Sequence, residues 1–328
     1  MSSRPKTHSA SPNLETELPS HWGTVQRTKN TVLFYLIRFL YSFISFIPYF
    51  IARRLGTLLG YLGYWLAILE RRKAMTHLAL AFPNVPHKTH KTTVRAMFVH
   101  LGQAVAEITH IDALIKHPDL QLSEEQHALI QECINEEKGV IAVTGHLGNW
   151  ELLAHVLAAH SLPVNTIAKP VYDPRLTQWV DRVRSRFGLR VIWRGRQSGI
   201  KEMLRVFRSK EILALLIDQD TRVQSVFVPF FGKPASTPSA AGVLALRTGA
   251  PILLGWLHRT KTGYKLHFER FTYKSTDDKD ADILAITAGI TQRLESGIRQ
   301  VPSQWVWMHR RWKTQPGENS DTALNVHS

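Results

Sequence analysis

Short apolar runs alternate with segments of helical periodicity through the second half of the chain. The runs predict strands at 139–144, 163–168, 190–193, 211–217 and 251–258, and the segment 264–271 also predicts a strand. The segments that separate or follow them predict helices at 150–160, 175–187, 199–209, 238–248 and 281–299. Because strands that alternate with helices are typical of α/β proteins, we expect a mixed, mostly buried sheet flanked by helices.

The N-terminal half carries two apolar blocks in place of this alternation. Residues 31–52 contain one charge, Arg38, and as a helix they would span about 33 Å, which is enough for a bilayer core. Arg38 and Pro48 oppose a straight span, because a charge is costly at depth and proline kinks a helix. A second apolar block at 55–69 runs into the charged sequence 70–73.

Four arrangements fit these blocks: a tilted span, a re-entrant hairpin, a helix lying in the membrane interface, and a buried core helix of a soluble protein. We expect residues 31–73 to anchor the protein to a membrane. They are rich in aromatic residues and flanked by basic ones, which suit an anionic cytoplasmic leaflet. The polar segments 1–30 and 314–328 predict disordered tails, and the first has no apolar core of a signal peptide. Residues 74–138 predict mainly helices.

The chain has 328 residues and a formal net charge of +15, which favours nucleic acid, anionic membrane or acidic protein as partners. Its single cysteine, Cys133, excludes an internal disulfide and a cysteine-rich zinc site. The sixteen histidines show no paired ligand spacing joined to a carboxylate, so we expect no metal.

One stretch combines a strand, a glycine turn and the start of a helix. His146 follows the strand, and Glu151 lies in the first turn of a helix capped by Asn149. A neutral imidazole accepts a proton near pH 7, and a carboxylate can hold its other ring nitrogen. Gly148 leaves the turn open to a substrate, and the helix N-terminus favours an anion. The alternative makes His146 a loop histidine and Glu151 a solvated helix residue.

The chain has no Gly-x-Ser-x-Gly sequence and its cysteine lies elsewhere, so a hydroxyl on the substrate is the expected nucleophile. The sequence His-Leu-Gly-Asn-Trp-Glu at 146–151 resembles the His-x4-Asp/Glu motif of glycerolipid acyltransferases, and its Gly-Asn-Trp-Glu form resembles the late acyltransferases of lipid A biosynthesis. Further similar stretches, at 77–83, 184–188, 226–238 and 304–313, extend the resemblance over about 31–313.

The resemblance implies a glycerolipid acyltransferase-like fold with an N-terminal membrane-associated helix. It implies acyl carrier protein as donor, a lipid A precursor as acceptor, and no cofactor. His146 would be the general base and Glu151 the residue that orients it. The candidate substrate-binding residues are Gly148, Asn149, Lys169, Arg184, Asp218, Asp220 and Arg310.

The reasons for choosing these candidate substrate-binding residues differ from one residue to the next. Arg184 offers a guanidinium for bidentate phosphate binding, or is a solvated helix residue. Asp218 and Asp220 follow an apolar strand, as His146 does, so both strand ends are expected to face one crevice; the alternative is that they only finish a turn. Lys169 stands where the family often has arginine. Arg310 lies among tryptophans, as in a membrane-interface belt or a carrier-protein docking site.

We therefore expect an O-acyltransferase on the cytoplasmic side of a bacterial inner membrane, with a tail at 1–30, a membrane-anchoring segment at 31–73, a catalytic domain at 74–313 and a tail at 314–328. One alternative uses the same residues on another glycolipid or a lysophospholipid. Another is a non-catalytic basic protein that binds membrane surfaces or nucleic acid, although no nucleic-acid-binding motif supports the latter. Acyl length, the acceptor hydroxyl and the choice of acyl carrier protein or coenzyme A stay open.

Overall fold

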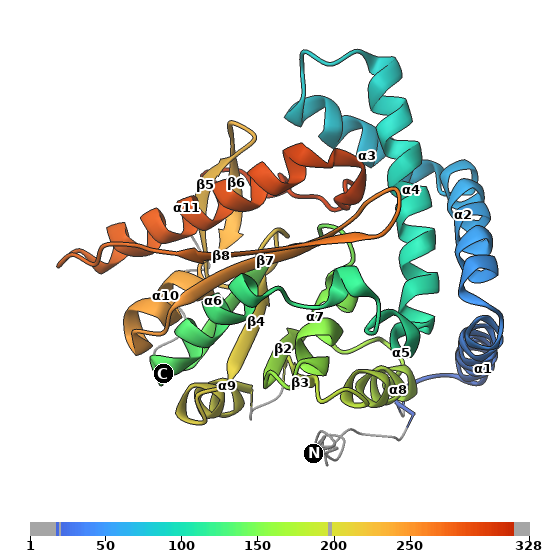
Figure 1. The fold of residues 1–328 in the computed structure, drawn as a ribbon. Coiled ribbons are helices and arrows are strands. Elements are labelled where there is room, and N and C mark those ends of the chain that lie inside the picture. Colours follow the sequence, from blue (N-terminus) through green and yellow to red (C-terminus); the bar gives the residue numbers. More distant parts are fainter. Residues whose placement is uncertain (1–17, 20, 196–198, 318–328) are drawn as a thin grey trace.

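The computed structural model describes residues 18–19, 21–195 and 199–317. Its centre is a six-stranded sheet made of β1 Val140–Thr144, β2 Val164–Ala168, β3 Arg190–Trp193, β4 Ile212–Leu216, β7 Ile252–Arg259 and β8 Tyr264–Phe271. The strand order is β3-β2-β4-β1-β7-β8, with β8 antiparallel to β7 and the other pairs parallel (Figure 1). The predicted α/β fold with a mixed, helix-flanked sheet is confirmed.

Both faces of the sheet are covered by helices. On β1, Ile141 and Val143 face one apolar core with α9 Gly199–Arg208, α10 Ala240–Thr248 and α11 Lys279–Gln300. Val140 and Ala142 face the other core with α6 Glu124–Asn135 and α7 Trp150–Ala159. Successive side chains of a strand point to opposite faces, so a strand covered on both sides is apolar throughout. This is why β1 and β4 appear in the sequence as nearly continuous apolar runs.

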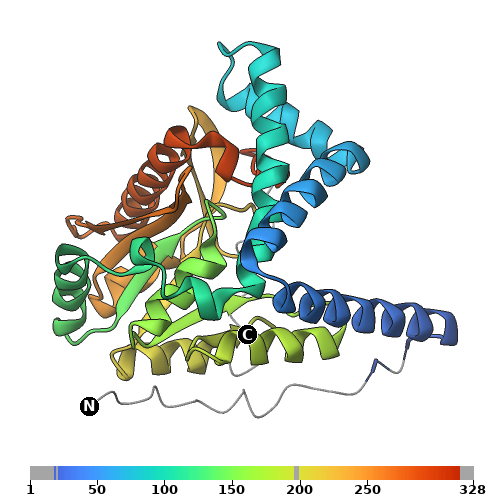
Figure 2. The ribbon, with the colours of Figure 1, turned by 45° about the vertical axis from the view of Figure 1, so that its right-hand side comes forward.

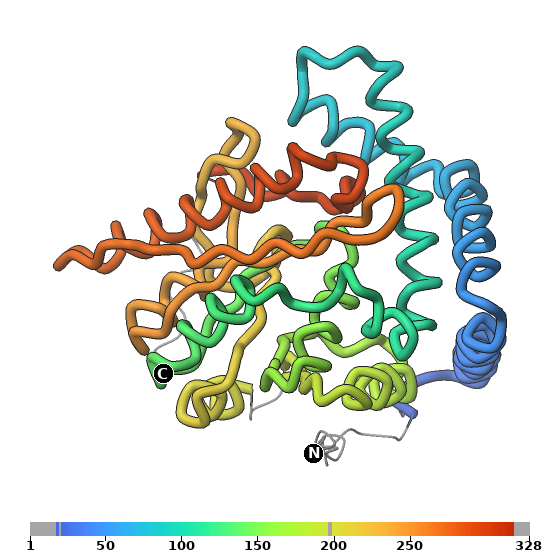
Figure 3. The backbone as a smooth tube through the Cα atoms, viewed as in Figure 1, coloured from blue at the N-terminus to red at the C-terminus, as the bar shows by residue number. Residues whose placement is uncertain are grey.

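The remaining helices complete the layers. They are α1 Thr24–Phe46, α2 Tyr49–Leu66, α3 Ile68–Ala81, α4 His87–Thr109, α5 Ile111–Leu114 and α8 Pro174–Ser185, with 3-10 turns η1 Pro118–Leu120 and η2 Pro302–Gln304. The trace in Figure 3 shows α11 running across the sheet beside β7, and η2 returning the chain towards α4. The helices predicted between and after the strands are all present, with ends shifted by a few residues.

A β-hairpin was missed by the sequence analysis. Strands β5 Ser225–Phe230 and β6 Lys233–Pro238 pair antiparallel, outside the main sheet. Phe231 and Gly232 form its two-residue turn with φ of 52° and 71°, as in a type I′ hairpin. Pro229 lies opposite Pro234, one step from the pair that closes the turn. Cross-strand pairs alternate between hydrogen-bonded and non-hydrogen-bonded, so both prolines occupy a position where no N–H is needed.

The N-terminal segment differs from the expectation in two ways. Helix α1 begins at Thr24, inside the segment predicted to be a tail; residues 1–17 and 20 lie outside the described residues. The chain also breaks between α1 and α2, because Pro48 caps the start of α2. A single helix over 31–52 is therefore wrong. Within the described ranges, none of the helices is long and apolar enough to cross a membrane.

Helix α2 packs closely on α4, whereas α1 projects from the body of the molecule (Figure 2). Glycines make the close packing possible. A Cβ on Gly56 would lie 2.4 Å from the carbonyl oxygen of Gly102, and one on Gly60 would lie 2.6 Å from that of Phe98. The faces of α1 and α2 that look away from α4 carry many exposed apolar side chains, including Phe39, Phe43, Leu58 and Trp65.

Candidate active site

The site begins where two neighbouring parallel strands end. β1 and β4 are paired with Thr144 opposite Leu216, so the residues that follow them emerge side by side. Nδ1 of His146 lies 2.8 Å from Oδ1 of Asp218, and the backbone N–H of His146 donates to Oδ2 at 2.6 Å. The prediction that the two strand ends face one crevice is confirmed.

Asp218 is fully buried and holds His146 in one tautomer. Its Oδ2 also accepts a hydrogen bond from Nε1 of Trp305 at 2.8 Å. Burial raises the pKa of Asp218, but the charge and hydrogen bonds of His146 and the bond from Trp305 outweigh it and lower the pKa to about 2. An ionised carboxylate accepts the Nδ1 proton of a neutral imidazole, so the lone pair that can act as a base is on Nε2.

Gln219 faces that lone pair. Its amide nitrogen lies 3.1 Å from Nε2 of His146 and 2.8 Å from Nε2 of His309. A side-chain amide carries two N–H donors, one for each ring. Burial, and then repulsion from His146, lower the pKa of His309 to about 4, so at neutral pH this ring is an acceptor. Gln219 therefore donates to Nε2 of His146, the ring nitrogen that carries the lone pair.

The structure corrects the expected contact between Glu151 and the imidazole. Glu151 pairs instead with Arg184 of α8: Nε of Arg184 lies 3.0 Å from Oε2, and a second N–H donates to Oε1. Both side chains are mostly buried. Glu151 lies in the first turn of α7, which directs it to α8, while Asp218 has taken Nδ1 of His146.

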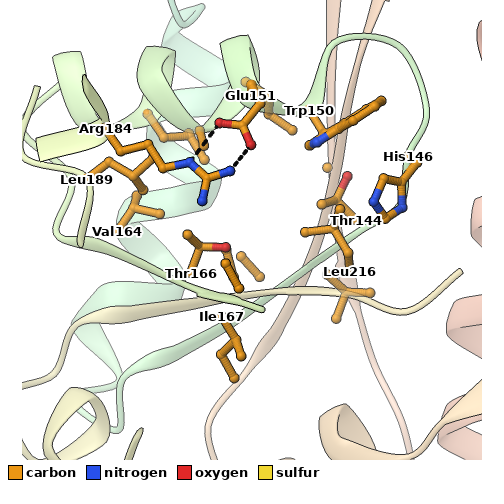
Figure 4. Close-up of a pocket in the computed structure, with 18 of the residues that line it drawn as sticks. Thr144, His146, Trp150, Glu151, Val164, Thr166, Ile167, Arg184, Leu189 and Leu216 are labelled. Carbon is orange, nitrogen blue, oxygen red and sulfur yellow. Dashed lines mark hydrogen bonds and ion pairs between the residues drawn. The ribbon is translucent and has the colours of Figure 1, made fainter. Parts of the chain in front are cut away.

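A cavity of about 300 Å³ joins the two pairs. Figure 4 shows His146 on one side of it, Val164 and Leu189 on the other, and the Glu151–Arg184 pair along the wall between them. Apolar side chains make up much of the rest of the wall, among them Leu153, Ala154, Leu157, Ala214, Leu253 and Phe268. The arrangement places the imidazole of His146 at one side of a largely apolar pocket.

Gly148 and Asn149, which were predicted to bind substrate, instead shape the turn before α7. Gly148 has φ +62°, and a Cβ there would lie 1.5 Å from the carbonyl oxygen of Leu257. Asn149 is buried, and both ends of its amide are engaged. Its Oδ1 accepts from the backbone N–H of Leu152 at 3.0 Å, and its Nδ2 donates to Glu107 at 2.8 Å. Asn149 thus caps α7 and fixes the turn, in place of the expected substrate contact.

The other candidates are spread around the site. Lys169 is exposed and lines the cavity. Asp220 accepts hydrogen bonds from the backbone N–H and hydroxyl of Thr314, at 2.7 and 3.1 Å, so the first residue of the segment predicted to be a loose tail is held. Residues 318–328 of that segment lie outside the described residues. Arg310 is exposed.

Sequence reasoning missed Gln219, His309 and Trp305 as parts of the site. Gln219 lies between the candidates Asp218 and Asp220, and the other two lie in the stretch 304–313, which resembles the family. It also missed Arg311, which is fully buried, donates to the carbonyl oxygen of Ser236 and packs over the ring of Phe230. Nothing in the local sequence separates the exposed Arg310 from the buried Arg311.

His309 is expected to make the fold sensitive to acid. Its pKa of about 4 in the fold lies below the value of 6.5 for an unperturbed histidine. Between these values the unfolded chain binds the extra proton. The contribution of His309 to the free energy of unfolding is therefore fully present above pH ~6.5. It falls by roughly 1 kcal/mol per pH unit as the pH drops towards ~4. Denaturant unfolding at several pH values measures this slope. His309→Gln should have a shallower slope than wild type, and identical slopes would contradict the assignment.

Comparison with known proteins places the chain among acyltransferases. The model of a family described as bacterial lipid A biosynthesis acyltransferase matches residues 24–314. A lipid A biosynthesis acyltransferase of Haemophilus influenzae is 27% identical over 307 residues, which cover 90% of this chain and 89% of the relative. A lipid A biosynthesis lauroyltransferase of Escherichia coli is 27% identical over 82% of this chain and 88% of its own length. A phosphatidylinositol mannoside acyltransferase of Mycobacterium tuberculosis is 24% identical over 57% of this chain and 58% of its own length.

Proposed function

This chain belongs to the bacterial lipid A biosynthesis acyltransferase family, and we propose that it transfers an acyl chain from the thioester of acyl carrier protein to a hydroxyl of a lipid A precursor. Family membership supports secondary acylation in lipid A synthesis. The observation that carries the proposed chemistry is the buried Asp218–His146 pair at the side of the apolar cavity.

In the proposed reaction His146 is the general base. Its Nε2 takes the proton of the acceptor hydroxyl, which displaces the amide of Gln219 from that position. Asp218 keeps the ring oriented and stabilises the imidazolium that forms. The alkoxide attacks the thioester carbonyl carbon. Collapse of the tetrahedral intermediate forms the ester and breaks the C–S bond, and the thiolate receives the proton from Nε2.

We assign the Glu151–Arg184 pair to the stabilisation of negative charge. Arg184 has five N–H donors, and Glu151 occupies two of them. The remaining donors are available at the cavity wall for the oxyanion of the tetrahedral intermediate. In this assignment Glu151 acts by holding Arg184, and it does not touch the base.

This role predicts that Arg184→Ala and Glu151→Ala each lower kcat by about a hundredfold, because one charged donor to the oxyanion is lost or misplaced. Steady-state acyl transfer measures the effect. Arg186→Ala is the matched control, since Arg186 is exposed and pairs with Asp112; it should stay within about twofold of wild type. Full activity of Arg184→Ala would exclude it from charge stabilisation.

The cavity is the proposed site for the acyl chain of the donor. Trp150, Leu153, Ala154 and Leu157 present one face of α7 to it, and each buried CH₂ of a bound chain gains about 0.8 kcal/mol. Ala154→Phe is expected to lower kcat/KM about tenfold or more for the longest donor accepted, and much less for shorter donors, because the larger ring fills the pocket. Assays with donors of different length measure this shift. Ala159→Phe, at an exposed position of the same helix, is the control.

We further propose that residues 31–73 hold the enzyme at the cytoplasmic surface of a bacterial inner membrane. The exposed aromatic and aliphatic side chains of α1 and α2 support an arrangement in which these helices lie in the interface. The net charge of +15 suits an anionic membrane and an acidic carrier protein. The proposal includes neither a cofactor nor a nucleic-acid partner, and it assigns 74–313 as the catalytic domain.

Acyl transfer by the purified protein tests the proposed function. Donors are the same acyl chain on acyl carrier protein and on coenzyme A, and acceptors are a lipid A precursor, a lysophospholipid and a mannosylated phosphatidylinositol. We expect transfer from acyl carrier protein to the lipid A precursor. The third acceptor is included because of the similarity to the mycobacterial enzyme. Transfer to only one of the other acceptors would reassign the acceptor, and a preference for coenzyme A would reassign the donor.

A further inference from the structure

A second cavity, of about 520 Å³, lies between α2, α4, the turn that joins β7 to β8, and η2. It shares no lining residue with the cavity beside His146. Its basic lining residues are Arg53 of α2, Arg95 of α4, Arg259 at the end of β7, and Lys261 in the turn after it. The lining residues include no carboxylate. The cavity therefore favours an anion.

Most of this charge is not neutralised by the protein. Arg259 pairs with Glu107, Nε to Oε1 at 2.6 Å. Arg53, Arg95 and Lys261 form no ion pair with any residue that the structure describes. Neutral donors stand beside the cations, namely the hydroxyls of Thr260 and Ser303 and the amide of Gln103, which gives one N–H to Thr57 and keeps a second. Several cations together with hydroxyl and amide donors suit an anion with several oxygens, such as a phosphate group.

The residues at the border of the cavity indicate which kind of molecule the phosphate group belongs to. Tyr61 lines the cavity and is 43% exposed. Leu58 and Trp65, three residues before and four after it on α2, are each 63% exposed. Residues at this spacing lie on one face of a helix. The cationic hollow thus opens beside an apolar helix face, which is the pattern needed for a molecule with an anionic head and apolar chains.

We propose that this cavity binds the phosphate headgroup of an anionic membrane phospholipid, whose acyl chains lie against the exposed face of α2. The site shares no lining residue with the cavity proposed for the reaction, and the proposal deepens the proposed membrane attachment, on which it rests. General electrostatic attraction to a membrane does not explain why the cations line a cavity. Binding of a nucleic acid or an acidic protein does not explain the exposed apolar side chains at the border of the cavity.

Two residues that line this headgroup site, His100 and Arg259, also hold the turn that carries His146. Nε2 of His100 donates to the carbonyl oxygen of Gly148 at 3.0 Å, and Arg259 donates to Nδ1 of His100 at 2.6 Å. Burial and the charge of Arg259 lower the pKa of His100 to about 3, so the ring keeps the single proton that this geometry needs. A headgroup bound in this cavity therefore lies behind Arg259 and His100, which support the turn that carries His146.

Vesicle co-sedimentation of the full chain tests the headgroup site. One set of vesicles is phosphatidylcholine alone, and in the other about a third of the lipid is phosphatidylglycerol. The pocket variant is Arg95→Ala with Lys261→Ala. The control variant is Arg208→Ala with Arg247→Ala, which removes the same charge from exposed positions on α9 and α10, at the far end of the sheet from α2. We expect wild type to bind the anionic vesicles more tightly, and the pocket variant to lose about tenfold of that affinity or more. The control variant should lose less than about threefold.

The other possible outcomes contradict different parts of the proposal: the role of the cavity, the identity of its ligand, or the membrane attachment itself. Equal losses in both variants would show general electrostatic attraction, and no loss in the pocket variant would exclude the cavity. Calorimetric titration with inorganic phosphate is a second arm. If phosphate binds wild type but not the pocket variant, while vesicle binding is the same for both, the cavity serves a soluble phosphate. If wild type binds neither kind of vesicle, the proposed membrane attachment fails as well.

Discussion

Asp218→Asn is expected to lower kcat by about 10³- to 10⁴-fold with little change in KM, the largest effect predicted for a single carboxylate of this chain. The carboxylate accepts the Nδ1 proton of His146 at 2.8 Å and keeps the lone pair on Nε2. An amide at this position can donate to Nδ1 instead, which stabilises the tautomer with the proton on Nε2. That tautomer cannot take a proton from a hydroxyl. Steady-state acyl transfer at neutral pH measures the loss.

Further variants make this result specific. His146→Ala should lose at least as much activity, and the double variant should be no worse than His146→Ala alone, because the two residues act as one unit. Asp220→Asn, two residues away, should stay within about tenfold of wild type, since Asp220 binds Thr314. Near-normal activity of Asp218→Asn together with complete loss in Glu151→Gln would return the orienting role to Glu151.

Glu107→Ala is expected to lower the free energy of unfolding by about 3–5 kcal/mol, because it leaves the charge of Arg259 buried without its partner. The carboxylate accepts from Arg259, from Nδ2 of Asn149 at 2.8 Å and from the hydroxyl of Tyr264 at 2.9 Å. Its pKa is lowered, because the hydrogen bonds and charge of Arg259 and the bonds from Asn149 and Tyr264 outweigh the effect of burial. Denaturant unfolding at pH ~7 measures the change.

Glu132→Ala is the matched control for Glu107→Ala. Its carboxylate forms an ion pair with Arg270 but is largely exposed, so its loss should cost about 1 kcal/mol or less. Arg259→Leu in the Glu107→Ala background should restore part of the stability, since it removes the unpaired charge. Equal stability of Glu107→Ala and wild type would mean that the buried pair does not support the catalytic turn.

The success of the strand predictions has a simple physical basis. A strand covered by helices on both faces buries every side chain, so β1, β4 and β7 leave an unbroken apolar run in the sequence. The hairpin of β5 and β6 left no such signal. Its prolines argue against a strand unless the pairing register is known, and Pro229 opposite Pro234 is a property of the pair.

Which apolar side chains of the N-terminal helices are buried and which are exposed depends on how α2 packs against α4. Its composition predicts apolar helices, and Pro48 marks a local break, but no local pattern shows which faces are covered. The glycines at 56, 60 and 102 allow α2 to lie against α4 at backbone distance, and this contact decides which apolar side chains stay exposed. The expected membrane-facing role of those side chains stays a prediction.

The sequence by itself determined the sheet, its flanking helices, the family, and the position of His146 at the end of a strand, because these depend on local periodicity and on a contiguous motif. Only the tertiary structure decided which carboxylate holds His146. Glu151 is five residues away in sequence, yet its helix turns it to Arg184. Asp218 is 72 residues away, yet the parallel pairing of β1 and β4 brings it within 2.8 Å of the ring. Strand order is fixed by the burial of whole faces of the sheet, and no segment of the chain encodes that alone.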